Sequence, residues 1–205
     1  YHVRLSDNTI LFFLSTDIDS NPPEWVSDMD ALYHGDTESL IRQQILLGVG
    51  GVKLLQSLGI EPKIYHLNEG RAEFLIWEVV TNLVREKNIT FEDAWNQTKE
   101  KIVYTNHTLV SAGNLTYPAE TIRKWARPFA EKLGVETDSL IKHGFRDSNT
   151  FSTTLFALNI SNKQSAVSKV HAEYARRDWP GYNWIGITNG VHLPRWQDSD
   201  FRNPE

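Results

Sequence analysis

The most constraining feature of this sequence is a repeated pattern: a short apolar stretch ends in polar residues, and a helical pattern follows. In the clearest copy, the apolar residues 102–104 are followed by Thr105, Asn106, His107 and Thr108. A short apolar run bounded by polar and glycine residues is typical of a buried strand that ends in a loop. Because ligands of open α/β sheets bind beyond the carboxyl ends of the strands, these four residues are predicted to line a crevice.

A second copy of the pattern comes earlier in the chain. The strand-like residues 63–67 are followed by Asn68, Glu69 and Arg71, and a helix is predicted for residues 72–85. The two strand ends predict one shared pocket. A helix N-terminus at this point would favour oxygen-rich or anionic groups, such as a sugar hydroxyl or a phosphate. Plain helix capping is the alternative for Asn68, while Glu69 is expected to bond sugar hydroxyls or neighbouring side chains.

The alternation of strands and helices along the whole chain predicts one α/β domain over residues 1–205. Strands separated by helical patterns favour right-handed crossovers, and therefore a Rossmann-like, mostly parallel sheet with helices on both faces. Residues 152–159 fit either a strand or a helix. The remaining strands are predicted at 10–14, 166–170 and 184–188, and the remaining helices at 35–59, 90–99, 118–133 and 136–143.

A glycine-rich stretch, GVGG at residues 48–51, invites comparison with a dinucleotide-binding fingerprint. The spacing fails because Lys53 stands where the third glycine belongs, and no strand immediately precedes the motif. Close packing of a helix is the preferred interpretation.

Composition narrows the classes of function. With 205 residues, 40% of them hydrophobic, the chain can bury a substantial core. A net charge of −5 argues against nucleic acid or an anionic membrane as a partner. The absence of cysteine excludes disulfides and thiolate metal sites and favours a reducing compartment, the cytoplasm. No histidine and carboxylate pair has metal-ligand spacing, so no metal is predicted.

Two features of the chain ends predict a fragment. The sequence begins on Tyr1 rather than methionine, and residues 198–205 form no recognisable final element. No apolar run approaches the roughly 20 residues that cross a bilayer, and no secretory signal is evident, so no membrane association is expected.

Four motifs that occur in one order make the chain resemble the α-glucan phosphorylases, the family of glycogen, starch and maltodextrin phosphorylases. The resemblance is closest to the shorter prokaryotic branch of that family and covers residues 11–196. The motifs are YHLNEG at 65–70 with Phe74, TNHT at 105–108 with AG at 112–113, VS at 167–168 with His171, and ITNGVHLP at 187–194 with Trp196.

The resemblance implies part of the N-terminal half of a two-domain glycosyltransferase-B fold, with the active site between the halves. It implies reversible phosphorolysis, in which inorganic phosphate attacks a terminal α-1,4 glucosyl unit of a glucan and gives glucose 1-phosphate. Pyridoxal phosphate would be bound mainly by the C-terminal domain, which these residues lack, so cofactor-binding residues are not assigned. The fragment alone is expected to be inactive, and the complete protein is compatible with a homo-oligomer.

The same resemblance implies roles for individual residues. His107 would hold the terminal glucose through its side chain and main-chain carbonyl, and Asn106 and Thr108 would shape the same wall. Asn68 and Glu69 would surround the sugar.

Several positions depart from the family pattern. Arg71, also a substrate-binding candidate, stands where the motif usually continues with histidine, and Glu73 replaces a small residue. Ser165 stands where an Asn-Gly pair usually begins. His171 is interpreted as a structural hydrogen bonder, and His66 as a packing residue.

Two other functions stay open from the sequence. One is a glycosyltransferase of the same architecture that uses a nucleotide sugar, as a glycogen synthase does. The other is a non-catalytic domain that binds glucan or regulates its metabolism, which the arginine at position 71 favours.

Overall fold

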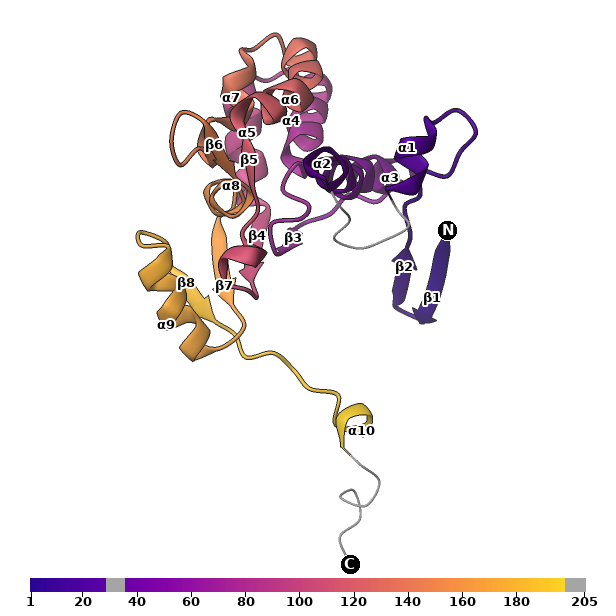
Figure 1. The fold of residues 1–205 in the computed structure, drawn as a ribbon. Coiled ribbons are helices and arrows are strands. Elements are labelled where there is room, and N and C mark those ends of the chain that lie inside the picture. The colour runs from indigo at the N-terminus through magenta and orange to yellow at the C-terminus, as the bar shows by residue number, and fades with distance from the viewer. Residues whose placement is uncertain (29–35, 198–205) are drawn as a thin grey trace, which may run out of the picture.

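The structure is a computed structural model that describes residues 1–28 and 36–197. Its centre is a four-stranded sheet with the order β3-β4-β7-β8, in which every neighbouring pair is parallel (Figure 1). The predicted α/β fold with a mostly parallel sheet is confirmed. Residue 35, the first of the predicted 35–59 helix, and residues 198–205 lie outside the described part. The four strands are β3 (Tyr65–Asn68), β4 (Ile102–Asn106), β7 (Lys163–Ala166) and β8 (Trp184–Gly186).

Helices flank this sheet, and two short antiparallel pairs of strands lie outside it. The pairs are β1 (His2–Ser6) with β2 (Thr9–Phe12) and β5 (Thr116–Pro118) with β6 (Thr150–Ser152). The helices are α1 (Pro23–Ser27), α2 (Thr37–Ile45), η1 (Leu46–Gly50), α3 (Gly51–Ser57), α4 (Leu75–Lys87), α5 (Phe91–Glu100), η2 (Ser111–Gly113), α6 (Ala119–Leu133), α7 (Thr137–Ile141), η3 (Lys142–Gly144), α8 (Thr153–Asn159), α9 (Lys169–Asp178) and α10 (Leu193–Trp196).

The long helix predicted for residues 35–59 is a continuous run of α2, η1 and α3, and its middle segment is a π-helix. The glycines in this run allow a close helix contact. A Cβ atom at Gly48 would lie 2.7 Å from the main-chain nitrogen of Leu75 and 2.8 Å from the carbonyl oxygen of Ala72. The predicted packing role of this glycine-rich stretch is therefore confirmed.

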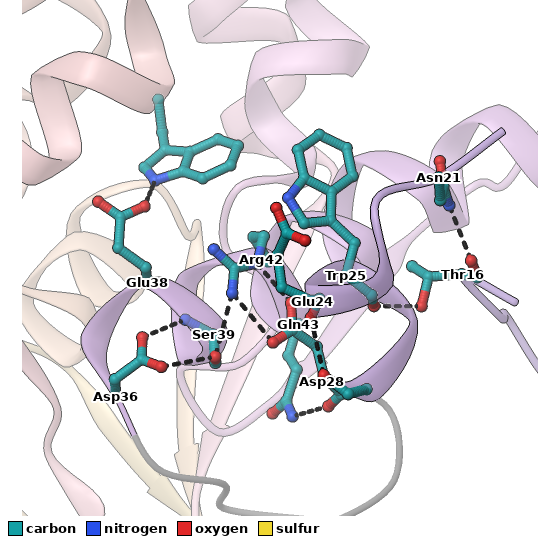
Figure 2. Close-up of polar contacts among 12 residues, drawn as sticks. Thr16, Asn21, Glu24, Trp25, Asp28, Asp36, Glu38, Ser39, Arg42 and Gln43 are labelled. Carbon is teal, nitrogen blue, oxygen red and sulfur yellow. Dashed lines mark hydrogen bonds and ion pairs between the residues drawn. The ribbon is translucent and has the colours of Figure 1, made fainter.

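Polar side chains tie α1, α2 and α6 together (Figure 2). The guanidinium of Arg42 donates two hydrogen bonds to the carboxylate of Asp28, one of them over 3.0 Å. The indole Nε1 of Trp125, on α6, donates to Glu38 over 2.9 Å. Asp36 caps α2, because its carboxylate accepts from the main-chain nitrogen of Ser39 over 2.9 Å.

The two faces of the sheet are covered unequally. Along β4, Ile102, Tyr104 and Asn106 are completely buried, whereas Val103 and Thr105 on the opposite face are only partly buried. The buried face meets the main core, which joins β3 and β4 to α4, α5, α6 and α8. Parallel sheets are usually covered on both faces. The described residues therefore cover one face well and leave the other partly open.

Three predicted elements differ from the structure. The predicted strand 10–14 is β2, which pairs antiparallel with β1 and lies outside the parallel sheet, because the polar Asp7 and Asn8 form a tight hairpin turn. The predicted strand 166–170 is misplaced, because it overlaps β7 only at Ala166, the last residue of that strand, and runs into α9. The residues that follow Ala166 begin α9 instead. Ser168 is the N-cap of this helix, and its hydroxyl accepts a hydrogen bond of 3.0 Å from the main-chain nitrogen of His171.

The helix predicted from residue 72 begins only at Leu75. Residues 69–74 form turns, and Glu69 adopts a left-handed conformation with φ of 63°. The prediction that Asn68 and Glu69 lie at a helix N-terminus is therefore wrong. Residues 152–159, for which strand and helix both fitted, form mainly α8, and the hydroxyl of Ser152 accepts from the main-chain nitrogen of Leu155 at its start.

Candidate functional site

The carboxyl ends of β3 and β4 lie side by side at one edge of the sheet. Asn68 is the register partner of Thr105, and the main-chain nitrogen of Glu69 donates to the carbonyl oxygen of Thr105 over 3.0 Å. The turn after β3 is thus held against the loop that follows β4. The two strand ends that the sequence singled out meet at one place.

The carboxylate of Glu69 organises this edge. Its Oε1 atom accepts a hydrogen bond of 2.6 Å from the main-chain nitrogen of His107. Its Oε2 atom lies 3.4 Å from the amide nitrogen of Asn106 and 3.5 Å from the hydroxyl of Tyr104. A positive φ is uncommon for a residue with a side chain. Glu69 has this conformation, and its carboxylate faces the loop after β4. The hydrogen bonds of the carboxylate therefore join the turn after β3 to the loop after β4.

Asn106 is the buried centre of the cluster, with no exposed surface. Its amide nitrogen donates to the hydroxyl of Tyr104 over 3.0 Å and to the carbonyl oxygen of Thr108 over 3.2 Å. Its carbonyl oxygen lies 2.8 Å from Nε2 of His171 on α9. The cluster therefore includes Tyr104 and His171, which were not predicted as site residues. The alternating burial of β4 carried a signal for Tyr104, since residues 102, 104 and 106 share one face.

A second set of side-chain hydrogen bonds runs across the opposite face of the sheet. Nε2 of His66 lies 2.7 Å from the hydroxyl of Thr105, which lies 2.7 Å from the hydroxyl of Ser165. These bonds join β3, β4 and β7. His66 is exposed and bonded across strands rather than buried in packing, so the interpretation of it as a packing residue is wrong.

The predicted site residues differ in their access to solvent. The side chains of His107 and Asn68 are exposed, and Thr108 and Glu69 are partly buried. Gly113 allows the loop to fold back on Thr108, because a Cβ atom there would lie 2.4 Å from the methyl carbon of Thr108. His107, anchored by its main chain, thus presents its imidazole at the edge of the sheet.

Arg71 follows Glu69 by two residues, in the same turn, and lies beside α2. Together with α2 and η1 residues it lines a small cavity of about 170 Å³. The structure therefore places this predicted substrate-binding residue beside α2. The other lining residues are Leu40, Gln43, Gln44 and Leu47.

Close enough to Tyr104 to raise its pKa lies a buried carboxyl group, Glu73. It has no exposed surface, and within the described residues neither of its carboxyl oxygens has a hydrogen-bond partner. Burial raises its pKa to about 8, and the polar main-chain N–H of Glu73 itself and, to a smaller extent, the nearby positive charge of Arg71 only partly oppose this. The group therefore keeps its proton at pH values at which an exposed glutamate has lost it. Burial likewise raises the pKa of Tyr104, and the charge of Glu69 adds to this effect.

The described residues bring no group of three or more histidine, aspartate or glutamate side chains into an arrangement that could hold a metal ion. Over the same residues, no helix combines the length and the apolar character that crossing a bilayer requires.

Fold and site together define an α/β protein with a polar, partly exposed cluster at the carboxyl ends of parallel strands. No family model matches the chain. It is 32% identical over 201 residues to the maltodextrin phosphorylase of Thermococcus litoralis, a match that covers 94% of this chain and 24% of that protein. The glycogen phosphorylases of Aquifex aeolicus and Mycobacterium tuberculosis are each 31% identical to it, over 95% and 91% of this chain and 29% and 24% of their own lengths.

The chain therefore belongs to the α-glucan phosphorylase family. It spans only about a quarter of the length of the curated relatives that it matches. The family that the ordered motifs indicated is confirmed.

Proposed function

We propose that this chain supplies the sugar-binding wall of an α-glucan phosphorylase, and that the complete protein catalyses reversible phosphorolysis of terminal α-1,4 glucosyl units. Its substrates would be a glucan and inorganic phosphate, and its product glucose 1-phosphate. The observation that carries the proposal is the hydrogen bond between the His107 main chain and the Glu69 carboxylate, within a chain homologous to phosphorylases.

In this proposal His107 is the residue that touches the sugar. Its main chain is fixed by Glu69 while its imidazole is exposed, so the ring is free to hydrogen-bond a glucosyl hydroxyl. Its carbonyl oxygen would face the positive charge that develops at the anomeric carbon as phosphate attacks, and such preorganised dipoles stabilise a transition state. Asn68 offers a further exposed amide, and Asn106 and Thr108 hold the loop in shape.

Pyridoxal phosphate does not fit the residues of this site. The cluster is built around the carboxylate of Glu69, and its donors are neutral groups: a main-chain N–H, the Asn106 amide and the Tyr104 hydroxyl. These donors already bond the Glu69 carboxylate, whose negative charge would repel a phosphate group. We therefore propose that the cofactor is bound by a part of the complete protein that corresponds to regions of the relatives outside the match.

We also propose a place for this chain in the complete protein. Residues 1–205 would form one α/β domain belonging to the N-terminal half of a glycosyltransferase-B fold, and a second domain would close the site. The exposure of Asn68 and His107 at the strand ends supports this, because a domain lying over them would complete the surroundings of the sugar. We also propose a cytoplasmic location, with which the absence of cysteine agrees, and, from the resemblance to the family alone, a homo-oligomeric complete protein.

The direct test uses the complete protein with maltodextrin and inorganic phosphate, and measures release of glucose 1-phosphate. We expect His107→Ala to lower kcat/KM by about a hundredfold or more, the usual size of a lost transition-state interaction. His143→Ala is the matched control, because His143 stacks on Trp95 away from the site and should leave the rate unchanged. Near-normal activity of His107→Ala would remove the main site assignment.

One observation favours a second function, a non-catalytic glucan-binding domain. Arg71 stands where the family motif usually has histidine, and it lies against α2. An arginine is always charged and cannot replace the acid–base versatility of imidazole. Glucan binding by calorimetry without any phosphorolysis would support this alternative, and transfer of glucose from a nucleotide sugar would support a synthase instead.

A further inference from the structure

His171 joins the site from a third element, yet the roles proposed above do not use it. It lies on α9, the helix that follows β7, and its Nε2 atom lies 2.8 Å from the carbonyl oxygen of the Asn106 side chain. Asn106 in turn contacts Glu69, which accepts the main-chain hydrogen of His107. A continuous set of hydrogen bonds therefore runs from α9 to the residue proposed to hold the sugar.

The hydrogen-bond pattern determines which partner donates. The amide nitrogen of Asn106 lies within reach of the carbonyl oxygen of Thr108 and the carboxylate of Glu69, at 3.2 Å and 3.4 Å. A main-chain carbonyl and a carboxylate can only accept. The amide must present its nitrogen to them, which leaves its oxygen toward His171. Nε2 of His171 therefore carries the hydrogen and donates it.

The surroundings of His171 favour the neutral ring. Burial lowers the pKa of this imidazole, and the nearby His107 lowers it further, while the carboxylate of Glu69 opposes both. These two groups come from the loops after β4 and β3. At neutral pH the ring is then the Nε2–H tautomer, with one donor fixed on Asn106.

We propose that His171 is a positioning residue of the sugar site: its Nε2–H fixes the Asn106 amide, which steadies the Glu69 carboxylate on the His107 main chain. The part of this proposal that concerns sugar binding rests on the proposed function, whereas the hydrogen bonds of His171 do not depend on it. His171 acts through other side chains and does not itself touch the sugar. Without this donor the Asn106 oxygen, which is completely buried, would lose its partner, and the amide could turn over.

The first test measures hydrogen exchange and the proton chemical shift of the His107 main-chain amide by NMR, on residues 1–205 without any sugar. In His171→Ala we expect exchange to accelerate on the order of tenfold, the effect of about one net hydrogen bond, with an upfield shift of the amide proton. His171→Gln, which keeps a donor, should restore most of the protection. His143→Ala, a second half-buried histidine outside the cluster, should change neither quantity.

The outcomes separate positioning from general stability. Unchanged exchange at His107 in His171→Ala would overturn the proposal, and so would equal acceleration in His171→Ala and His143→Ala. Because no sugar is present, this result stands even where the complete protein proves not to be a phosphorylase. In an active phosphorylase, His171→Ala should lower kcat/KM roughly tenfold and His171→Gln should recover it. An unchanged kcat/KM in the alanine variant would also overturn the positioning role.

Discussion

Glu73 is the residue at which burial and charge conflict most directly. Its carboxyl group is completely buried and, within the described residues, unbonded, so its ionised form is strongly disfavoured in the folded protein. Its pKa rises from the ordinary 4.5 to about 8 on folding. The folded protein therefore keeps a proton that the unfolded chain releases. Stability from this group is fully present below pH 4.5 and is lost as the pH rises to about 8.

Glu73→Gln should remove this pH dependence, because a neutral amide of similar shape does not titrate. At about 1.4 kcal/mol for each pKa unit, the wild-type free energy of unfolding should fall by a few kcal/mol more than that of the variant between about pH 5 and pH 8. Urea unfolding at several pH values measures the difference. Glu78→Gln is the control, because Glu78 is also buried but pairs with Lys53 over 2.9 Å. This variant still contains Glu73 and should keep the steep loss of stability between about pH 5 and pH 8. Parallel stability curves for wild type and Glu73→Gln would contradict this account.

Within the helical run α2–η1–α3, two glycines three positions apart differ in the space around them. A Cβ atom at Gly48 would lie 2.7 Å from the main chain of α4, whereas a Cβ atom at Gly51 would meet nothing within 4 Å. We expect Gly48→Ala to destabilise the protein by about 1–3 kcal/mol through overpacking. Gly51→Ala should stabilise it by roughly 0.5–1 kcal/mol, because alanine favours a helix. Urea unfolding compares the two variants, and equal effects would refute the close contact between η1 and α4.

The junction of α1 and α2 depends on the fork of hydrogen bonds between Arg42 and Asp28 (Figure 2). The side chain of Asp28 is only 4% exposed. We expect Arg42→Lys to cost about 1.5–3 kcal/mol, because an ammonium cannot bond both carboxylate oxygens in the same way. Arg123→Lys is the matched control. Arg123 makes the same fork with Asp138, whose side chain is 57% exposed, so its loss should cost about 1 kcal/mol or less.

The strands and helices differ in how well the sequence predicted them. The parallel strands and the long helix followed from apolar runs and their periods, and the meeting of Asn68 with Thr105 followed from parallel strands ending at one edge. The position of α9 relative to Asn106 could not be predicted, because it depends on tertiary packing that no local pattern contains. The start of α4 was misjudged for a local reason. The left-handed backbone at Glu69 begins a turn that a sequence of helix-forming residues conceals.

At the scale of the whole molecule, the partly open face of the central sheet bears on whether copies of the chain associate. Val103 is only partly buried, and Ile185 and Ile187 are 43% and 59% exposed. Val103 and Ile185 lie on the face opposite the core, and the ladder continues to Ile187, whose nitrogen donates to Ala166. Polar side chains of β7, Lys163 and Ser165, lie between Val103 and the two isoleucines, so the exposed apolar surface is the pair Ile185 and Ile187 at the β8 edge. Parallel sheets are usually covered on both faces, and this pair therefore marks a part of the open face that is normally covered.

We therefore expect residues 1–205, prepared alone, to associate as their concentration rises, with this sheet face at the contact. Sedimentation velocity over a range of concentrations would measure the association. Ile185→Lys should weaken it by placing a charge on the open face, and its free energy of unfolding should change by less than about 0.5 kcal/mol, because the position is exposed. Val170→Lys is the control, since Val170 is 61% exposed on α9 and is the residue before His171, away from this face. A monomer at all concentrations, or equal weakening by both variants, would show that the open face is not what drives association.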